Sequence, residues 1–365
     1  MSVQSALNGV IMRSVAMGRW AVAGMFLVNG FVMGAWAPQI PLMLPRHGIA
    51  EGMMGLLILG LGLGAVCAMV FSGRLIQRFG SVRVVIAFAC ALVPVLPAMI
   101  FAHEIWVLAL AMVAFGAIAG SMDVAMNANA VEVERGLGRA IMSSSHGFWS
   151  LGGFLGCSLG GLAIEGFGRE GQSLAVAAAM AAVILWAAPR LWRGGAASQR
   201  EAAPGTSGTR AKAPLFPRDP AVWMLGLIAL LCMVPEGAIM DWSALFLTDE
   251  LALSQAWSGL GFALFAGSMA VMRFAGDAVR NRFGAVKTLR FSALIAAGAL
   301  LAASVAPNAG LVLMAFAVAG LGIANTVPIL FSAAGNLRGM SPGAGLATVT
   351  MIGYAGILVA PSSIG

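Results

Sequence analysis

The carboxylates inside apolar stretches are the residues of this sequence best suited to chemistry. Asp123 lies within a long apolar stretch, and Asn127 follows four residues later. Residues four apart share one face of a helix, because they differ by about 40° around its axis. A charge at bilayer depth costs several kcal/mol, so an acid placed there calls for a function. The sequence predicts that Asp123 takes up and releases a proton, with Asn127 beside it.

Glu236 and Asp241 are a second acidic pair. They are five residues apart and would point about 140° apart on a regular helix. Pro235 and Gly237 flank Glu236 and predict a break in the helix, as at many transporter sites. Asp241 and Trp242 lie near the expected extracellular end and could instead be interfacial. Glu236 is therefore the second predicted proton-coupling residue.

Other polar and aromatic side chains in apolar stretches could hold a small polyhydroxylated solute by hydrogen bonding and stacking. The predicted substrate-binding residues are Asn29, Trp36, Gln39, Asn127, Asp241, Trp242, Asn325 and Tyr354. His146 could relay protons and Trp149 could anchor a helix at the interface, but we favour a structural role for both. The four cysteines form no CxxC pattern, so we expect no metal and no cofactor.

The apolar stretches are long enough to cross a bilayer. The chain has 365 residues, 60% hydrophobic and 10% charged, with a mean hydropathy of +0.93, which excludes a soluble globular protein. A span needs about twenty apolar residues. The Pro307-Asn308 turn divides the run 291–337 in two, so eleven spans are predicted. The uncharged runs are 20–45, 52–73, 84–103, 105–122, 140–164, 171–189, 220–235, 251–272, 291–337 and 339–365.

The basic residues predict the orientation. Of the 21 Lys and Arg residues, 19 fall in the N-terminal tail and in loops that follow even-numbered spans, and only Arg46 and Arg169 fall in the others. Because Lys- and Arg-rich short loops stay in the cytoplasm, we expect the N-terminus there, in a protein of the bacterial cytoplasmic (inner) membrane. The same rule explains a pI near 10.2, so no nucleic-acid partner is expected.

An internal repeat predicts two halves. GRLIQRFGSVRVV at 73–85 aligns with DAVRNRFGAVKTL at 277–289, an offset of 204 residues. The predicted domains are a six-helix bundle at 1–192, a cytoplasmic loop at 193–220 that is rich in Gly, Ala, Pro and Ser, and a second bundle at 221–365. Parallel halves of this kind bind solutes at the midplane. The second half has five predicted spans, so we expect the last helix to be missing from this chain.

These features resemble the major facilitator superfamily, which implies an all-α polytopic membrane protein of two pseudo-symmetric six-helix bundles. The family motif Gly-x-x-x-Asp-Arg-x-Gly-x-Arg/Lys matches 73–83, except that Gln77 replaces the acid. In the family this acid engages a neighbouring helix end and latches one conformation. The resemblance implies latch residues at Gly73, Gln77, Arg78, Gly80, Arg83, Arg273 and Asp277. Arg273 and Asp277 are expected to pair at the cytoplasmic end of the eighth span.

Two branches of the superfamily are the most similar. SSSHGFWSLGG at 143–153, EGAIMDWSALFL at 236–247 and the Gly-Tyr-x-Gly at 353–356 resemble the MosC-like branch. Asp123 and Asn127 match the spacing of a proton-carrying acid and an Asn in the fucose–proton symporter branch. That branch's second acid falls on Gly34 here, so a two-acid mechanism does not transfer.

The expected function is a secondary active transporter for a small polar organic solute, sugar- or polyol-like, coupled to protons and working as a monomer in the lipid bilayer. The glycines at 152–161 keep a drug or metabolite efflux antiporter open, although Cys157 replaces the proline of that motif. A transporter-like membrane sensor also stays open. An enzyme is not expected, because the chain has no DDxxD, HxxxxD or HExxH motif. The chain also has no Walker motif, which disfavours ATP-driven transport.

Overall fold

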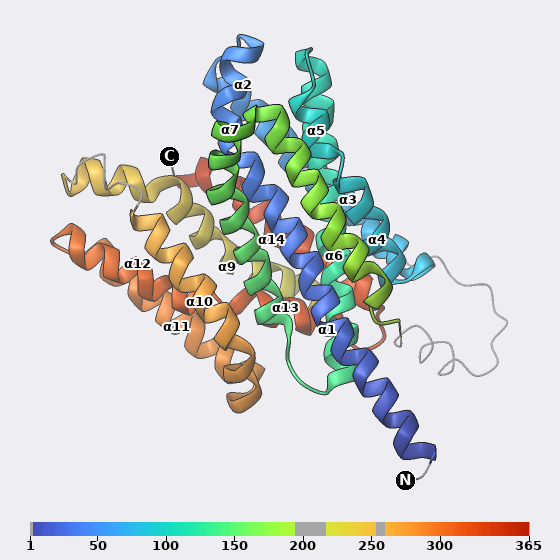
Figure 1. The fold of residues 1–365 in the computed structure, drawn as a ribbon. Coiled ribbons are helices and arrows are strands. Elements are labelled where there is room, and N and C mark those ends of the chain that lie inside the picture. The colour runs from blue at the N-terminus through green and yellow to red at the C-terminus, as the bar shows by residue number, and fades with distance from the viewer. Residues whose placement is uncertain (1–2, 194–216, 253–259, 365) are drawn as a thin grey trace. The chain divides into compact units, whose positions relative to one another are not determined.

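The computed structural model describes residues 3–193, 217–252 and 260–364, and the secondary structure in these ranges is helical (Figure 1). The first half contains α1 (Val3–Trp36), η1 (Ala37–Gln39), α2 (Ile40–His47), α3 (Glu51–Phe79), α4 (Ser81–Leu92), α5 (Val95–Ile100), α6 (Ile105–Leu137), α7 (Met142–Ala187) and η2 (Ala188–Arg190). Most of the predicted linker 193–220 lies outside the described residues.

The second half contains seven elements in its described ranges. They are α9 (Pro220–Leu245), a π-helical turn η3 (Phe246–Glu250), α10 (Leu260–Phe283), α11 (Ala285–Ser304), α12 (Ala309–Ile323), α13 (Thr326–Gly335) and α14 (Pro342–Ile364). The predicted turn at Pro307-Asn308 is confirmed, because Asn308 caps α12 by accepting a hydrogen bond from the Leu311 amide. The predicted break beside Pro235 is wrong, because α9 stays helical through this proline.

Nine helices within the described residues are long and apolar enough to cross a membrane. One of them, Met142–Arg190, has 49 residues, and its backbone leaves helical geometry at Gly168 (φ 71°, ψ 171°). Two predicted spans, 140–164 and 171–189, therefore fall on one kinked helix. The predicted span 339–365 falls on α14, which has 23 residues and is not among the nine.

The repeated motif produces the same backbone turn in both halves. Gly80 joins α3 to α4 with φ 82° and ψ 154°, and Gly284 joins α10 to α11 with φ 81° and ψ 160°. Non-glycine residues very rarely adopt this combination of angles. The two glycines of the Arg-Phe-Gly-x-Val repeat are therefore required by the turn.

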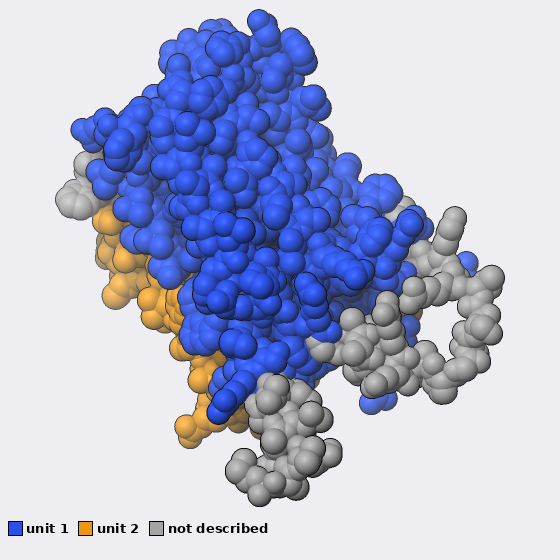
Figure 2. Space-filling model, turned by 45° about the vertical axis from the view of Figure 1, so that its right-hand side comes forward, with its two compact units in different colours: residues 1–139, 148–218, 335–348 blue, residues 140–147, 219–334, 349–365 orange. Residues whose placement is uncertain are grey.

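The chain divides into two compact units (Figure 2). Unit 1 comprises residues 1–139, 148–218 and 335–348, and unit 2 comprises 140–147, 219–334 and 349–365. The units differ from the predicted bundles in two segments. The start of α7 packs within unit 2, and the start of α14 packs within unit 1.

The core of unit 1 surrounds α6, in which every residue from Ala119 to Val131 is buried. The helices α1 and α7 also approach closely through glycines. An added Cβ would lie 2.2 Å from the Leu27 carbonyl oxygen at Gly152, and 2.1 Å from the Phe31 carbonyl oxygen at Gly156. These distances confirm that the glycines of α7 serve close helix packing.

The core of unit 2 is an apolar cluster shared by α9, α10, α11 and α12 and the turn after α9. Its largest members are Ile239, Leu247, Phe265, Met269, Phe316 and Ile323. This packing fixes the position of α10 between its neighbours, and α10 carries the charged residues described next.

Candidate functional site

Asp123 lies at the buried centre of α6, as expected for an acid at membrane depth. Its side chain is 4% exposed, and its Oδ1 accepts a hydrogen bond of 3.2 Å from Asn127 Nδ2. The same Nδ2 lies 2.9 Å from the Asp123 carbonyl oxygen. The prediction that Asp123 and Asn127 share one face of a helix is therefore confirmed.

The second carboxylate oxygen of Asp123, Oδ2, has no hydrogen-bond partner among the described residues. Nearly all buried polar atoms in folded proteins are hydrogen-bonded, because an unsatisfied one costs its full desolvation. Asp123 Oδ2 is one of the exceptions within the described residues, and it lies at the centre of a buried helix.

Arg273 and Glu236 form a second charged site, in unit 2. Arg273 Nη2 lies 4.0 Å from Glu236 Oε2, and the side chains are 6% and 25% exposed. Arg273 precedes the end of α10 at Phe283 by ten residues, or about 15 Å along the helix. The helix thus continues beyond the residue at which the uncharged run ends, and the ion pair recorded for Arg273 within the described residues is with Glu236 of α9.

His146, near the start of α7, adjoins this pair. It is 8% exposed, and its ring packs edge-on against Phe331, with centroids 5.8 Å apart. It is also close enough to Arg273 to interact with it electrostatically. The aromatic contact agrees with the structural role expected for His146 and places an imidazole beside the buried guanidinium.

Asp277, one turn after Arg273, caps the N-terminus of α7. Its Oδ1 accepts the Ser143 amide at 2.9 Å, and its Oδ2 accepts the Ser144 amide at 3.0 Å and the Ser144 hydroxyl. Asn281, one further turn along, accepts the Ala140 amide at 3.0 Å. An acid at a helix N-terminus satisfies orphan amides and complements the helix dipole. Asp277 and Asn281 of the second motif copy therefore bind backbone amides at the N-terminal end of α7, within unit 2.

The first motif copy is arranged differently. Gly73 permits close packing of α3 on α14, since an added Cβ would lie 2.9 Å from the Gly343 carbonyl oxygen. Gln77, which occupies the position of the family acid, is exposed and has no recorded hydrogen bond within the described residues. Its counterpart at the offset of 204 is Asn281, which does bind a helix end. Sequence reasoning missed Asn281, although the repeat alignment pointed to it.

The first copy also borders a cleft of about 400 Å³ in unit 1. Arg78, Gly80 and Arg83 line it, together with Glu132 of α6, whose Oε2 accepts a hydrogen bond of 2.9 Å from Ser81. Three of the predicted latch residues thus line a cleft at the end of α3.

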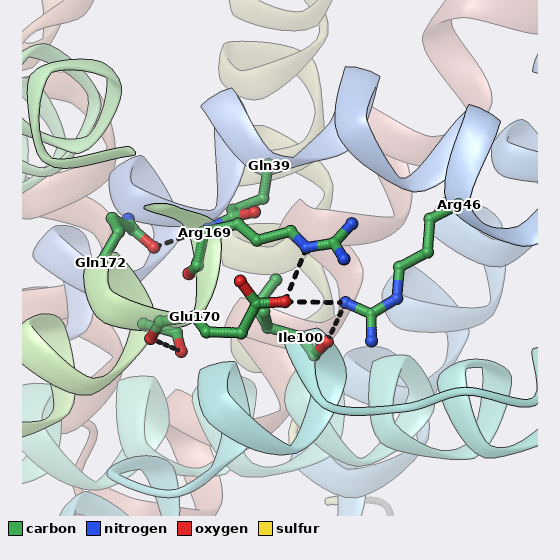
Figure 3. Close-up of polar contacts among 7 residues, drawn as sticks. Gln39, Arg46, Ile100, Arg169, Glu170 and Gln172 are labelled. Carbon is green, nitrogen blue, oxygen red and sulfur yellow. Dashed lines mark hydrogen bonds and ion pairs between the residues drawn. The ribbon is translucent and has the colours of Figure 1, made fainter. Parts of the chain in front are cut away.

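Two of the predicted substrate-binding amides are engaged in helix packing. Asn29 Nδ2 donates to the Ala119 carbonyl at 3.1 Å, and Asn29 Oδ1 accepts from Trp149 Nε1 at 2.9 Å. Gln39 Nε2 donates to Gln172 Oε1 at 2.7 Å and to the Arg169 carbonyl at 3.1 Å (Figure 3). These bonds join α1 and η1 to α6 and α7.

Arg46 and Arg169, the two basic residues in loops that follow odd-numbered predicted spans, both approach the carboxylate of Glu170 (Figure 3). Glu170 Oε1 lies 2.7 Å from Arg169 Nε and 3.6 Å from Arg46 Nη1. Arg46 also donates to the Ile100 carbonyl. The cluster joins α2, α5 and α7 next to the kink at Gly168.

The remaining predicted binding residues have varied surroundings. Asn325, at the junction of α12 and α13, is fully buried, and neither polar atom of its side chain has a hydrogen-bond partner within the described residues. Trp36 is 4% exposed, Trp242 has a buried Nε1 without a recorded partner, and Tyr354 is partly exposed. The side chain of Asp241 lies outside the described part of the chain.

Comparison with known proteins places these sites in a family. A model described as Major Facilitator Superfamily matches residues 22–361. An uncharacterized MFS-type transporter of Yersinia pestis is 35% identical over 343 residues, which is 93% of this chain and 86% of that protein. Membrane protein MosC of Rhizobium meliloti is 31% identical, over 94% of this chain and 82% of MosC.

A solved structure shows the same fold. The fucose:proton symporter FucP of E. coli, in the outward conformation, matches with a TM-score of 0.74 at 14% identity, over 96% of this chain and 91% of FucP. The family model and the two relatives each cover more than nine-tenths of the sequence. This protein therefore belongs to the Major Facilitator Superfamily and is an integral membrane transporter.

Proposed function

We propose that this chain is a secondary active transporter that moves a small polar organic solute, sugar- or polyol-like, by alternating access and in symport with protons. The observation that carries the proposal is the buried, unpartnered Oδ2 of Asp123 beside Asn127. FucP, a fucose:proton symporter with the same fold, supports this solute class. The protein lies in the bacterial cytoplasmic membrane as a monomer, with its N-terminus in the cytoplasm.

Asp123 is the proton carrier in this scheme. Loss of its charge removes the cost of an unsatisfied buried carboxylate, so the neutral state can cross between the two access states. Asn127 holds one carboxylate oxygen through its amide and leaves the other open to a proton or a solute hydroxyl. Glu236 is the second proton-coupling residue in the scheme, and its carboxylate, 25% exposed, lies 4.0 Å from Arg273 Nη2.

In this scheme the solute is bound by Asn127, Asn325, Trp242 and Tyr354, with Trp36 and Asp241. The side-chain amide of Asn325 and the indole nitrogen of Trp242 are buried and have no hydrogen-bond partner within the described residues. Buried amide and indole groups without partners favour a solute with several hydroxyl groups, because each hydroxyl both donates and accepts. Asn29 contributes indirectly, by holding α1 in place, whereas Gln39 binds Gln172 through Nε2 and has a buried Oε1 with no hydrogen-bond partner within the described residues.

The efflux-antiporter alternative has less support. The antiporter interpretation rests on the glycine pattern of α7. Gly152 and Gly156 of that pattern lie close to backbone atoms of α1. Close helix packing therefore accounts for the pattern without antiport.

The test is uptake into proteoliposomes that contain the purified protein, with an imposed pH gradient and a panel of sugars, polyols, organic acids and cationic drugs. We expect accumulation of one polar solute class, accompanied by proton entry. Asp123→Asn should abolish accumulation and proton entry, while exchange of labelled for unlabelled solute persists. The matched control is Glu165→Gln, which neutralises an exposed carboxylate of α7.

Two results would contradict the proposal. If Asp123→Asn inserts normally and still accumulates solute with protons, Asp123 is not the carrier. If only cationic drugs move, and they move against proton entry, the protein is an efflux antiporter.

A further inference from the structure

Three arginines line the cleft at the end of α3 in unit 1, and none of them has an acidic partner within the described residues. They are Arg78, Arg83 and Arg193, and the cleft has a volume of about 400 Å³. The ion pairs recorded in the described ranges involve other arginines. We propose that this cleft binds a phosphate group, carried either by an anionic lipid headgroup or by a soluble phosphate compound.

The charges around the cleft favour a negatively charged ligand. Among the described residues, Glu132 is the one acid that lines the cleft, and its Oε2 accepts a hydrogen bond of 2.9 Å from Ser81. The three guanidinium groups therefore outweigh the acid. Like charges around one cleft repel each other, and a bound anion relieves that repulsion. Phosphate fits best, because a guanidinium binds two of its oxygens through paired N–H groups.

Two helix N-termini border the same cleft. α4 begins at Ser81 without a side-chain cap, and α14 begins at Pro342, directly after Ser341. The hydroxyl oxygen of Ser341 is buried and has no hydrogen-bond partner within the described residues. The uncapped amides and the positive ends of the helix dipoles add to the attraction for an anion. The Ser341 hydroxyl is a further donor for a phosphate oxygen.

A buried amide holds two sides of the cleft together. Asn129 of α6 is fully buried, and its Nδ2 lies 3.2 Å from both Ser81 Oγ and the Trp192 carbonyl oxygen. These contacts tie the start of α4 to the residue before Arg193. The positive-inside rule accounts for arginines at this end of the helices, but not for a shared cleft fixed by a buried side chain.

The size and the position of the cleft suit both sources of phosphate. A volume of about 400 Å³ is typical of small-ligand sites, so the cleft has room for a phosphate with an attached polar group. Arg78 and Arg83 flank the end of the membrane-length helix Glu51–Phe79. In the proposed orientation this end faces the cytoplasm, where anionic lipid headgroups lie at the membrane surface.

The experiment measures ligand binding to the purified full-length protein in a neutral detergent at pH 8. One arm titrates inorganic phosphate by calorimetry, with sodium chloride at matched ionic strength as the blank. The other arm compares phosphatidylglycerol with phosphatidylcholine, at equal mole fractions, by counting the lipids retained in native mass spectra. We expect saturable phosphate binding, preferential retention of phosphatidylglycerol, or both. Lipid retention alone identifies a headgroup as the source, and phosphate binding alone identifies a soluble compound.

Three variants locate the binding. Arg78→Gln and Arg83→Gln should each weaken it about tenfold or more, because a hydrogen bond to a charged group contributes that much. Glu132→Gln should tighten it several-fold, because the variant removes the negative charge and keeps an oxygen for Ser81. The matched control is Arg139→Gln, which neutralises an exposed arginine of unit 1 outside the cleft and should bind like the original protein.

The proposal is overturned if neither phosphate nor phosphatidylglycerol binds, or if Arg78→Gln and Arg83→Gln bind as tightly as the Arg139→Gln control. If neither of these cleft arginine variants folds, Glu132→Gln decides, and unchanged or weaker binding contradicts the proposal. No transported solute is needed, so this result is independent of the transport assay and of the proposed symport.

Discussion

Replacing Gly156 with alanine tests whether the glycines of α7 set its distance from α1. The new Cβ would lie 2.1 Å from the Phe31 carbonyl oxygen and 2.7 Å from the Ala35 amide nitrogen. Both are backbone atoms, so no side-chain rotation relieves the clash. A carbon–oxygen contact needs about 3.3 Å, so the helices must separate locally by roughly 1 Å.

The expected cost follows from a matched substitution on the same helix. Gly161→Ala adds the same methyl group where no atom lies within 4 Å. The gain in helix propensity, about 1 kcal/mol, is common to both variants and cancels between them. Overpacking typically costs about 1–3 kcal/mol, so Gly156→Ala should be less stable than Gly161→Ala by that amount.

The assay is the thermal unfolding midpoint of both variants, purified in one detergent. Gly156→Ala should unfold a few degrees below Gly161→Ala, and Gly161→Ala should match or exceed the original protein. Equal midpoints for the two variants would refute the reasoning, because they would mean that α1 and α7 tolerate a methyl group between their backbones.

Substitutions at three further positions test other contacts by the same midpoint measurement. Asn308→Ala removes the cap on the Leu311 amide and should cost about 1 kcal/mol, whereas Asn308→Asp should cost little. Asn29→Leu leaves the Trp149 indole without its acceptor and should cost about 1–3 kcal/mol; a smaller loss than that of Asn308→Ala would contradict the packing role. Glu170→Gln removes an ion pair whose acid is 41% exposed, so its effect should stay below about 1 kcal/mol and shrink in high salt.

Local rules predicted the features that depend on neighbours in the sequence. The Asp123–Asn127 contact follows from helix geometry alone, and the structure contains it. The turn at Pro307-Asn308 follows from residue types that favour turns, and Asn308 caps α12 there. Each of these is decided within about one helical turn, so the sequence suffices.

The partners of buried polar groups could not be predicted in the same way. Asn29 and Gln39 resembled solute-binding residues because both lie in apolar stretches. Their hydrogen bonds go to residues 90 to 133 positions away, and only the packing of helices selects those partners. Pro235 shows the same limit, since a proline weakens a helix locally but packing can keep it helical.

Arg273 shows that a helix can continue beyond the charge that ends an uncharged run. The uncharged run 251–272 ends at Arg273, and treating charges as span boundaries put the residue at the edge of the membrane. The helix continues for ten residues beyond it, without a turn, to Phe283. A basic residue followed by another ten helical residues calls for a partner inside the protein, and within the described residues the ion pair recorded for Arg273 is with Glu236 of α9.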